Sequence, residues 1–242
     1  MPTVLLFDVD GTLTPSGEQI KKEMLDCLIE IKNKHPDIQL GIVGGGTCEK
    51  ISWQLNNNNN LLKYLFCECG SKVFIDGNLI FEQNILNFTN RDYLNSIIKE
   101  ALKQISNMPI IFNGHQIDFR TGLIYISPPG MQSGKLERDY FKEMNTNDWL
   151  RNGLINKLKQ RDVKNIFDIV LGGEVGVALY PKGWDKSQVM RHFSGEQIYY
   201  FGDRCEPDGN DYPLYSHKSV HGISVKNYQE TINKLKELFL KD

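Results

Sequence analysis

Two short apolar runs that stop abruptly at polar or glycine residues mark the start of the chain. Val4–Phe7 stops at Asp8, and Ile38–Val43 stops at Gly44. A continuous apolar run such as Val4–Phe7 is typical of a strand buried on both faces of a parallel sheet, and Ile38–Val43 is predicted as a second apolar strand. Between the two runs, apolar residues recur at the spacing of one helix face: Ile20, Met24, Leu28 and Ile31. Strand and helix therefore alternate, which favours a doubly wound α/β sheet.

The alternation continues to residue 81. The pattern predicts a helix over Glu49–Leu55, a strand over Leu65–Cys67 and a hairpin with strands over Ser71–Ile75 and Leu79–Phe81. The hairpin is indicated by Asp76-Gly77-Asn78, a turn sequence that joins antiparallel strands. The run Asn56–Asn60 is a low-complexity surface loop.

The middle of the chain has a different pattern. Apolar residues over Tyr93–Ile105 predict a helix. Four strands follow in two tightly connected pairs, with helices between the pairs at Lys135–Met144 and Trp149–Arg161. The strands are Gln116–Phe119 with Gly122–Ser127, and Asp168–Leu171 with Val175–Tyr180. Because tight connections join antiparallel neighbours, this segment reads as a separate α+β module.

The first pattern returns after Pro181-Lys182-Gly183. A helix is predicted over Lys186–His192, a strand over Ile198–Phe201 and a helix over Tyr228–Leu240. We therefore expect an α/β fold: a doubly wound, mainly parallel Rossmann-like core with an inserted α+β cap domain made of an antiparallel sheet plus helices. The core would take residues 1–81 and 185–242, and the cap residues 82–184.

Composition limits the partners that this chain can have. The 242 residues include 28 Lys and Arg against 30 Asp and Glu, a net charge of −2. Such a balance gives no general electrostatic attraction to nucleic acid or to an anionic membrane. The apolar stretch that ends at Phe7 is too short for a signal peptide, and no apolar run approaches membrane-spanning length. We expect neither a nucleic-acid nor a membrane partner.

The number and positions of the cysteines indicate the redox state of the compartment in which the protein works. There are five: Cys27, Cys48, Cys67, Cys69 and Cys205. Their odd number and scattered positions, without a Cys-x-x-Cys pair, argue against a disulfide framework or a structural zinc site. A reducing, cytoplasmic location is the expectation.

The most informative segment is Asp8-Val9-Asp10-Gly11-Thr12, directly after the first strand. It places two carboxylates at the C-terminal end of a parallel strand, where open α/β sheets bind ligands. In extended geometry Asp8 and Asp10 point the same way and Val9 points away. Two nearby carboxylates attract a hard divalent cation, and one of them can attack phosphorus while the other handles a proton. An Asp-rich turn is the alternative reading of the Asp-x-Asp pair alone.

This segment resembles the Asp-x-Asp-x-Thr signature of the haloacid-dehalogenase-like phosphotransferase superfamily. The resemblance implies that Asp8 is the phosphorylated nucleophile and Asp10 the general acid/base. Phe201-Gly202-Asp203, followed by Gly209-Asn210-Asp211, resembles the acidic magnesium motif, so that Asp8, Asp10 and Asp203 are the implied metal ligands. Lys186 resembles the lysine that neutralises the charges of aspartate and phosphoryl group. Taken singly, Asp203 could be a turn residue and Lys186 a solvated lysine.

Longer motifs narrow the resemblance to the eukaryotic-type phosphomannomutases. They are Phe7–Thr14, Val43-Gly44-Gly45, Phe119-Arg120-x-Gly122, Ser127-Pro128-x-Gly130 and Pro181-x-Gly183-Trp184-Asp185-Lys186. The resemblance implies a Mg²⁺-dependent mutase that interconverts mannose 6-phosphate and mannose 1-phosphate, for GDP-mannose synthesis. It also implies a hexose 1,6-bisphosphate activator and intermediate, a small-molecule sugar phosphate as the partner, and a homodimer formed through the cap.

The same resemblance implies a set of substrate-binding positions. Arg120 and Arg138 align with cap arginines that would hold the phosphate that is not reacting, although a solvated arginine is also a reasonable reading of Arg138. Further implied positions are Gly45 and Thr47 for phosphate, and Gly176 and Ala178 on the cap strand that faces the sugar.

Several of these positions depart from the family pattern. Gly176 and Ala178 stand where a Ser and an Asp are usual, and Met131 where an arginine is usual. A basic residue is missing in the stretch Pro15-Ser16-Gly17, Gly46 replaces a Ser, Cys69 an Asn, and His217 an Asp of a possible second metal loop. The departures keep two alternatives open: a Mg²⁺-dependent phosphatase acting on another sugar phosphate, and a non-enzymatic binding protein.

Overall fold

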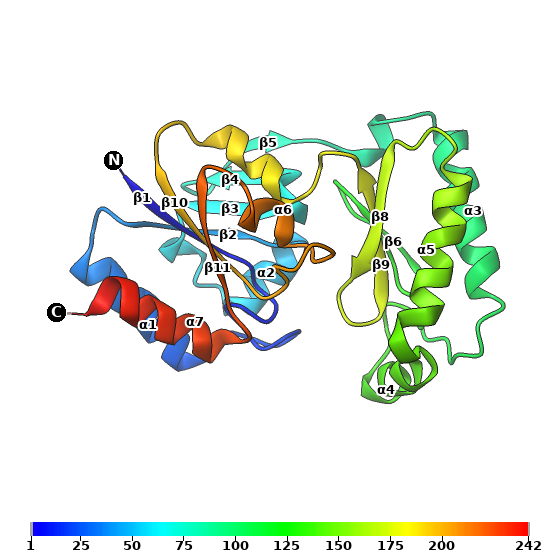
Figure 1. Cartoon of the computed structure of the whole chain (residues 1–242), viewed down its shortest axis with the longest axis horizontal. Coiled ribbons are helices and arrows are strands. Elements are labelled where there is room, and N and C mark those ends of the chain that lie inside the picture. The colour runs from blue at the N-terminus through cyan, green and yellow to red at the C-terminus, as the bar shows by residue number, and fades with distance from the viewer. Residues whose placement is uncertain (1, 242) are drawn as a thin grey trace. The chain divides into compact units, whose positions relative to one another are not determined.

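A computed structural model describes residues 2–241, which fold into two compact units (Figure 1). Unit 1 joins the two ends of the chain, up to Glu82 and from Gly183 onward, and unit 2 is Gln83–Lys182. The sequence analysis placed an insertion at 82–184. Its role as a substrate-binding cap stays a prediction.

Unit 1 is built on a seven-stranded sheet with the strand order β11-β10-β1-β2-β3-β4-β5. In that order the strands are β11 (Val220–Ser224), β10 (Gln197–Gly202), β1 (Thr3–Phe7), β2 (Gln39–Val43), β3 (Tyr64–Cys67), β4 (Lys72–Ile75) and β5 (Asn78–Glu82). The first five are parallel to one another, β4 pairs antiparallel with β3, and β5 pairs antiparallel with β4. The expected mainly parallel, doubly wound core is confirmed.

β1 lies in the middle of this sheet because its side chains are apolar on both faces. Leu5 and Phe7 pack on the face covered by α1 (Lys22–Lys34) and α7 (Tyr228–Leu235). Val4 and Leu6 pack on the opposite face, with side chains from η5 (Lys186–His192) and α6 (Tyr212–Tyr215). All four strand residues have an exposed fraction of 0%. The helices therefore cover both faces of the sheet (Figure 1), as a parallel sheet requires.

The remaining elements of unit 1 are short connections. They are α2 (Cys48–Gln54), the 3-10 turns η1 (Asn59–Leu61) and η2 (Glu68–Gly70), and the π-helical turn η6 (Lys236–Leu240) that extends α7. The predicted C-terminal helix over Tyr228–Leu240 is thus one α-helix followed by a π turn. The segment predicted as a helix at Lys186–His192 is the 3-10 helix η5.

Unit 2 is an antiparallel sheet with the order β6-β7-β9-β8. Its strands are β6 (Ile117–Phe119), β7 (Ile124–Ile126), β8 (Phe167–Gly172) and β9 (Gly176–Pro181), and its helices are η3 (Ile85–Asn87), α3 (Arg91–Ile105), α4 (Lys135–Met144), η4 (Thr146–Asp148) and α5 (Trp149–Arg161). The two expected hairpins and the helices between them are confirmed.

One face of the unit 2 sheet is buried and the other is more open. Ile124, Ile126, Val177 and Leu179 are fully buried, and α5 packs on β8 and β9. Tyr125, Ala178 and Val170 alternate with them and pair across the strands, and all three are only half-buried. We call the face that carries Tyr125 and Ala178 the open face of unit 2.

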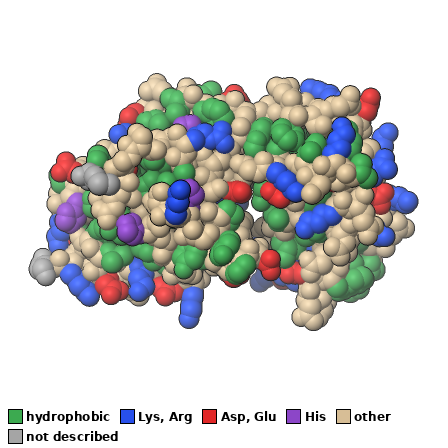
Figure 2. All heavy atoms as spheres, turned by 45° about the horizontal axis from the view of Figure 1, so that its top comes forward, with side chains coloured by type: hydrophobic (Ala, Val, Ile, Leu, Met, Phe, Trp, Pro, Cys, Tyr) green, Lys and Arg blue, Asp and Glu red, His purple; other side chains and the backbone are tan. Residues whose placement is uncertain are grey.

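Two properties of the molecule bear on its partners. No helix in residues 2–241 is both long and apolar enough to cross a membrane. On the face seen in Figure 2, Lys and Arg side chains are interspersed with Asp and Glu. This mixture agrees with the small net charge of −2.

Candidate active site

The strand geometry of β1 decides where Asp8 points. Val4 and Leu6 lie on the face covered by η5 and α6, so the next even residue, Asp8, continues on that face. Val9 turns to the opposite face and packs with α1. Asp8 is 6% exposed, and its backbone N–H donates to Phe201 O at 2.9 Å. The nucleophile predicted from the sequence is therefore a buried carboxylate held between the ends of β1 and β10.

Lys186 meets Asp8 from η5. Asp185 caps this helix by accepting the Ser187 N–H at 2.8 Å, which places Lys186 at the first helical position. The Lys186 Nζ lies 2.5 Å from Asp8 Oδ1 and 2.6 Å from Asp211 Oδ1, and its side chain is 0% exposed. Burial lowers the pKa of Lys186, but the two carboxylates outweigh it and hold that pKa above its usual range. Lys186 is therefore a buried cation paired with two carboxylates, and its role in neutralising a phosphoryl group stays a prediction.

Asp211 and Tyr200 fix the position of this cation. Asp211 Oδ1 also accepts the Tyr200 hydroxyl at 2.6 Å, and Asp211 Oδ2 accepts the Arg204 N–H at 3.0 Å. Burial and the nearby Asp211 carboxylate raise the pKa of Tyr200 well above its usual value. Tyr200 therefore stays a neutral donor. The sequence analysis quoted Asp211 as part of the acidic magnesium motif but did not predict its contact with Lys186. It gave Tyr200 no role.

A third carboxylate, Asp203, completes an acidic cluster. Ligand atoms of Asp8, Asp203 and Asp211 all lie within 4.8 Å of one another. Asp203 lies against the loop after β1, because a Cβ added at Gly11 would be 2.5 Å from Asp203 Oδ2. Gly11 also has a φ of +85°, so that both the close approach and the left-handed backbone require glycine.

The cluster fits a magnesium ion by its donor set and by its charge. Hard divalent cations prefer carboxylate oxygens, and the carboxylates here are strained by their mutual repulsion. Burial and the neighbouring Asp211 raise the pKa of Asp203 to about 6, and burial raises that of Asp8 to about 7 despite Lys186. A bound cation would offset both effects.

This arrangement predicts a pH-dependent stabilisation by Mg²⁺. Because the folded-state pKa of Asp8, about 7, exceeds its ordinary value of 3.8, the metal-free fold binds more protons than the unfolded chain and loses stability as pH rises through that interval. Mg²⁺ needs the ionised form, so the rise in melting temperature on adding Mg²⁺ should be larger at about pH 8 than at about pH 5.5. Thermal unfolding at matched ionic strength, with Na⁺ as the control, measures it. Equal shifts at both pH values would contradict the carboxylate site.

Asp10 has different neighbours. Asp10 Oδ2 pairs with Lys50 Nζ at 2.7 Å, and Asp10 Oδ1 accepts from Gln54 Nε2 and from the Gly17 N–H, both at 2.7 Å. Burial raises the pKa of Asp10, but Lys50 and these hydrogen bonds bring it below its usual range. Among the described residues its carboxylate is not one of the clustered group, and its roles as metal ligand and acid/base stay predictions.

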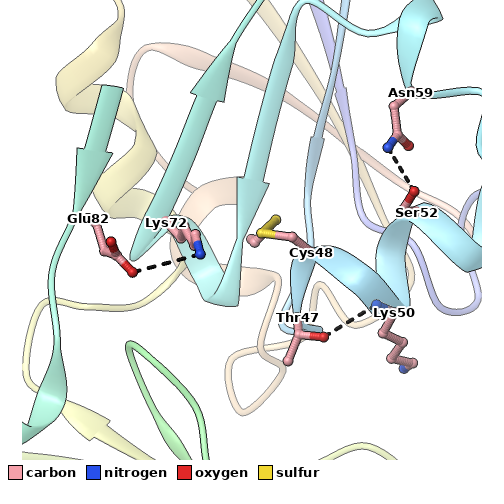
Figure 3. The surroundings of a disulfide bond; sticks show 8 residues. Thr47, Cys48, Lys50, Ser52, Asn59, Lys72 and Glu82 are labelled. Atoms are coloured by element: carbon pink, nitrogen blue, oxygen red, sulfur yellow. Dashed lines mark hydrogen bonds and ion pairs between the residues drawn. A yellow bond between two sulfur atoms is a disulfide. The ribbon is translucent and has the colours of Figure 1, made fainter. Parts of the chain in front are cut away.

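The predicted phosphate-binding residues Gly45 and Thr47 lie in the connection between β2 and α2. Thr47 is the N-cap of α2, where its Oγ1 accepts the Lys50 N–H at 3.3 Å (Figure 3). A Cβ added at Gly45 would lie 3.8 Å from Cys69 Sγ. Since β1 and β2 are parallel neighbours, this loop and the Asp8 loop share one edge of the sheet.

The residue after Thr47 takes part in a disulfide that the sequence analysis did not anticipate. Cys48 at the start of α2 is bonded to Cys67 at the end of β3, with Cα atoms 5.4 Å apart and a sequence separation of 19 (Figure 3). The argument against a disulfide framework overlooked this pair, because neighbouring strand ends bring together cysteines whose spacing carries no motif. Cys27, Cys69 and Cys205 are free and buried.

In unit 2, Arg120 is held in a defined geometry. Its Nε donates to Asp118 Oδ2 at 2.8 Å, and its guanidinium lies 4.8 Å from the centre of the Tyr125 ring. Its side chain is 12% exposed. Asp118, Arg120 and Tyr125 all belong to the open face of the sheet. Arg120 thus presents a planar cation that ion pairing and stacking have already oriented.

Tyr125 also explains the departures at Gly176 and Ala178. Ala178 is the cross-strand partner of Tyr125. A Cβ added at Gly176 would lie 2.3 Å from the Tyr125 ring, and the Tyr125 hydroxyl donates to Gly172 O at 3.0 Å. The tyrosine therefore occupies the space that a side chain at position 176 would need. The two small residues and Tyr125 belong together as one packing arrangement.

The other arginines of unit 2 have separate surroundings. Arg138, on α4, donates from Nε to Ser133 O at 3.1 Å. Arg151, which the sequence analysis did not name, is 7% exposed and donates to the carbonyls of Gly173 and Gly176 at 3.1 and 3.4 Å. It pairs with Asp148 on the same side of α5. Arg151 ties α5 to the β8–β9 hairpin and is a structural residue.

The fold and this acidic, lysine-paired site define the class of protein. The structure of a haloacid dehalogenase-like hydrolase from Bacteroides thetaiotaomicron matches with a TM-score of 0.61 at 14% identity, over 97% of this chain and 92% of that one. The C-terminal domain of a trehalose-6-phosphate phosphatase from C. albicans matches with a TM-score of 0.68 at 13% identity, over 99% and 93%. The chain therefore has the haloacid-dehalogenase-like fold, whose members generally use Mg²⁺.

Sequence relatives identify the family within that class. The family model for eukaryotic phosphomannomutase matches residues 24–241. Phosphomannomutase 1 of Dictyostelium discoideum is 35% identical over 99% of this chain and 97% of its own length. The phosphomannomutase of Arabidopsis thaliana is 32% identical over 98% and 96%. The chain belongs to the eukaryotic phosphomannomutase family, and the resemblance stated from its motifs is confirmed.

Proposed function

We propose that this chain is a phosphomannomutase that interconverts mannose 6-phosphate and mannose 1-phosphate, as a step toward GDP-mannose. The observation that carries the proposal is the buried Asp8–Lys186 pair, found in a chain that matches phosphomannomutases over nearly its whole length. The alternative of a phosphatase with another substrate is not favoured, because the relatives matched over the full length are named phosphomannomutases.

The first chemical step uses Asp8. An oxygen of the Asp8 carboxylate attacks the phosphorus of a phosphorylated sugar, the new oxygen–phosphorus bond forms, and the bond to the sugar oxygen breaks as Asp10 gives that oxygen a proton. Lys186, already fixed beside Asp8 by Asp211 and Tyr200, neutralises negative charge that would otherwise repel the phosphoryl group. Because the cation is positioned before substrate arrives, little reorganisation is needed at the moment of transfer.

The second step returns the phosphoryl group to a sugar hydroxyl. The hydroxyl oxygen bonds to phosphorus, the Asp8–phosphorus bond breaks, and Asp10 accepts the hydroxyl proton. A hexose 1,6-bisphosphate is then both the intermediate and the activator that first phosphorylates Asp8. The proposal assigns the non-reacting phosphate to Arg120 and Arg138, and phosphate contacts to Gly45 and Thr47.

Magnesium belongs to this proposal. Asp8 and Asp203 would hold it, with Asp211 or Asp10 completing the protein ligands. When bound, the ion supplies positive charge that stabilises the charge on the transferring phosphoryl group.

The decisive experiment compares isomerisation with hydrolysis. Purified protein with Mg²⁺ and a hexose 1,6-bisphosphate is given mannose 1-phosphate, and mannose 6-phosphate and free phosphate are measured in parallel. We expect isomerisation to exceed phosphate release by a large factor. Phosphate release without isomerisation would overturn the mutase assignment, and a parallel reaction with glucose 1-phosphate reports sugar selectivity.

The proposal extends to location and assembly. A cytoplasmic location suits an enzyme of sugar phosphates, and in a reducing compartment we expect Cys48 and Cys67 as thiols. A homodimer formed through unit 2 is supported by apolar side chains on and near its edge strand β6: Ile111, Phe112 and Phe119 are 46%, 47% and 50% exposed. The mass in solution, by light scattering, checks the dimer.

A further inference from the structure

Both oxygens of the Asp10 carboxylate accept hydrogen bonds. Lys50 Nζ holds Oδ2, while Gln54 Nε2 and the Gly17 N–H hold Oδ1, each at 2.7 Å. Lys50 and Gln54 are one helical turn apart, so α2 presents both to the same point. Oδ2 has the Lys50 contact alone among these three and Oδ1 has the other two, so that release of Lys50 would leave Oδ2 open to accept a proton.

The contacts differ in how easily they can be given up. Gln54 is 1% exposed, and its amide also lies 3.5 Å from Thr14 Oγ1. The Gly17 contact is made by the backbone. Lys50 has a flexible stem and a side chain that is 43% exposed, paired with an Asp10 side chain that is 36% exposed. Ion pairs this exposed are only weakly favourable, so the Lys50 contact is the one that can exchange.

Lys50 is also placed among groups that suit a phosphate. Its backbone N–H is bonded to Thr47 Oγ1, at the loop proposed to contact phosphate. Figure 3 shows the Lys50 side chain extending from α2 away from Cys48. The stretch Pro15-Ser16-Gly17 lacks the basic residue usual at that point in the family, and Gly17 instead gives its N–H to Asp10. In this chain the basic side chain paired with Asp10 is Lys50, from α2.

We propose that Lys50 is a phosphate-binding residue that rests on Asp10 in the free protein and moves to the phosphoryl group of the bound sugar phosphate. The move frees Asp10 Oδ2 to accept the sugar hydroxyl proton, while Gln54 and Gly17 keep Oδ1 in place. A doubly charged phosphoryl group competes well for the ammonium, since it offers more negative charge and more acceptor oxygens than one carboxylate. The inference rests on the proposed function for the identity of the substrate.

The test measures the binding of inorganic phosphate in the presence of Mg²⁺ by titration calorimetry, which requires no turnover. Lys50→Met keeps the length of the stem and removes the charge, and should weaken phosphate binding by roughly 10- to 100-fold, the range of a lost charge-assisted hydrogen bond. Lys50→Arg should restore most of the affinity. Lys22→Met, which removes an exposed helix lysine paired with Asp26 at 2.6 Å, is the matched control and should change nothing.

Gln54→Leu separates binding from positioning. If Gln54 only orients Asp10, its variant should lower kcat without changing phosphate affinity, whereas Lys50→Met should raise KM for the sugar phosphate. Phosphate affinity unchanged in Lys50→Met overturns the inference, even if the protein is an active mutase. Weakened phosphate binding in Lys50→Met supports it, even if mannose 1-phosphate is not the substrate. Wild-type protein that binds no phosphate would overturn it as well.

Discussion

Replacing Asp8 with Asn should abolish turnover and leave the protein folded. Asn keeps the size and shape of the side chain but cannot form the phosphoryl bond. Loss of a catalytic nucleophile costs at least about 10⁴-fold in kcat. The measurement is the coupled mutase assay, together with a search for phosphorylated protein by intact mass after incubation with a hexose bisphosphate. Wild-type protein should gain a phosphoryl group, and Asp8→Asn should not.

The stability of Asp8→Asn makes the prediction sharper. Burial raises the pKa of Asp8 to about 7, so that the ionised Asp8 of the metal-free protein at pH 8 lowers the stability of the fold. Asn removes that cost, and Asp211 remains as a partner of Lys186. We therefore expect a metal-free melting temperature at pH 8 no lower than that of wild type, with a reduced shift on adding Mg²⁺. Asp26→Asn, on the exposed surface of α1, is the control. A variant that keeps measurable mutase activity would contradict Asp8 as the nucleophile.

Replacing Lys186 with Met should have the largest effect on stability. The methionine fills the space of the stem but leaves the carboxylates of Asp8 and Asp211 buried without their cation. Breaking a buried ion pair in this way costs about 3–5 kcal/mol of unfolding free energy. The turnover of any folded protein should also fall, by about 10²- to 10³-fold, since a charge-stabilising group is lost. Urea unfolding and the mutase assay measure the two effects.

Two comparisons make the Lys186 prediction specific. The destabilisation should shrink at acidic pH, where a carboxylate that has lost its cation takes up a proton. Lys182 lies two residues before Trp184, and its Nζ donates at the surface to Asn165 Oδ1 at 2.8 Å, so Lys182→Met should cost less than about 1 kcal/mol. Equal losses for both variants would show that Lys186 is not the charge partner that its geometry indicates.

Much of the fold is readable from the sequence because the buried strands carry their own signal. Val4–Phe7 is apolar at every position and Ile38–Val43 at all but Gln39 and Gly41, as is typical of strands covered on both faces, and they correspond to β1 and β2. β11 was not predicted. It lies at the edge of the sheet, and its residues are all exposed or half-buried, so that no apolar run marks it. A continuous apolar run marks a strand that is buried on both faces, and an edge strand such as β11 has no such run.

The site was predictable only where a motif stands at a strand end. Asp8 and Asp203 follow β1 and β10, and Lys186 lies in a run that is specific for its family. Lys50 and Gln54 were missed because they reach Asp10 across 40 and 44 residues of sequence, from a neighbouring helix. Their spacing of four residues on one helix face was the available signal. Tyr125 was missed because its effect on Gly176 exists only across paired strands.

The split of unit 1 between the two ends of the chain has a consequence for synthesis on the ribosome. β1 pairs on one side with β2 and on the other with β10, and Asp8 meets Lys186 across 178 residues. A nascent chain that has emerged only to Lys182 holds Asp8 without its cation, without Asp203, and with one edge of β1 open. Contacts this distant in sequence form late in folding. The proposed phosphoryl transfer therefore has to wait until the chain has been translated beyond Asp211, and a product terminated before Lys186 holds Asp8 without the groups proposed to act with it.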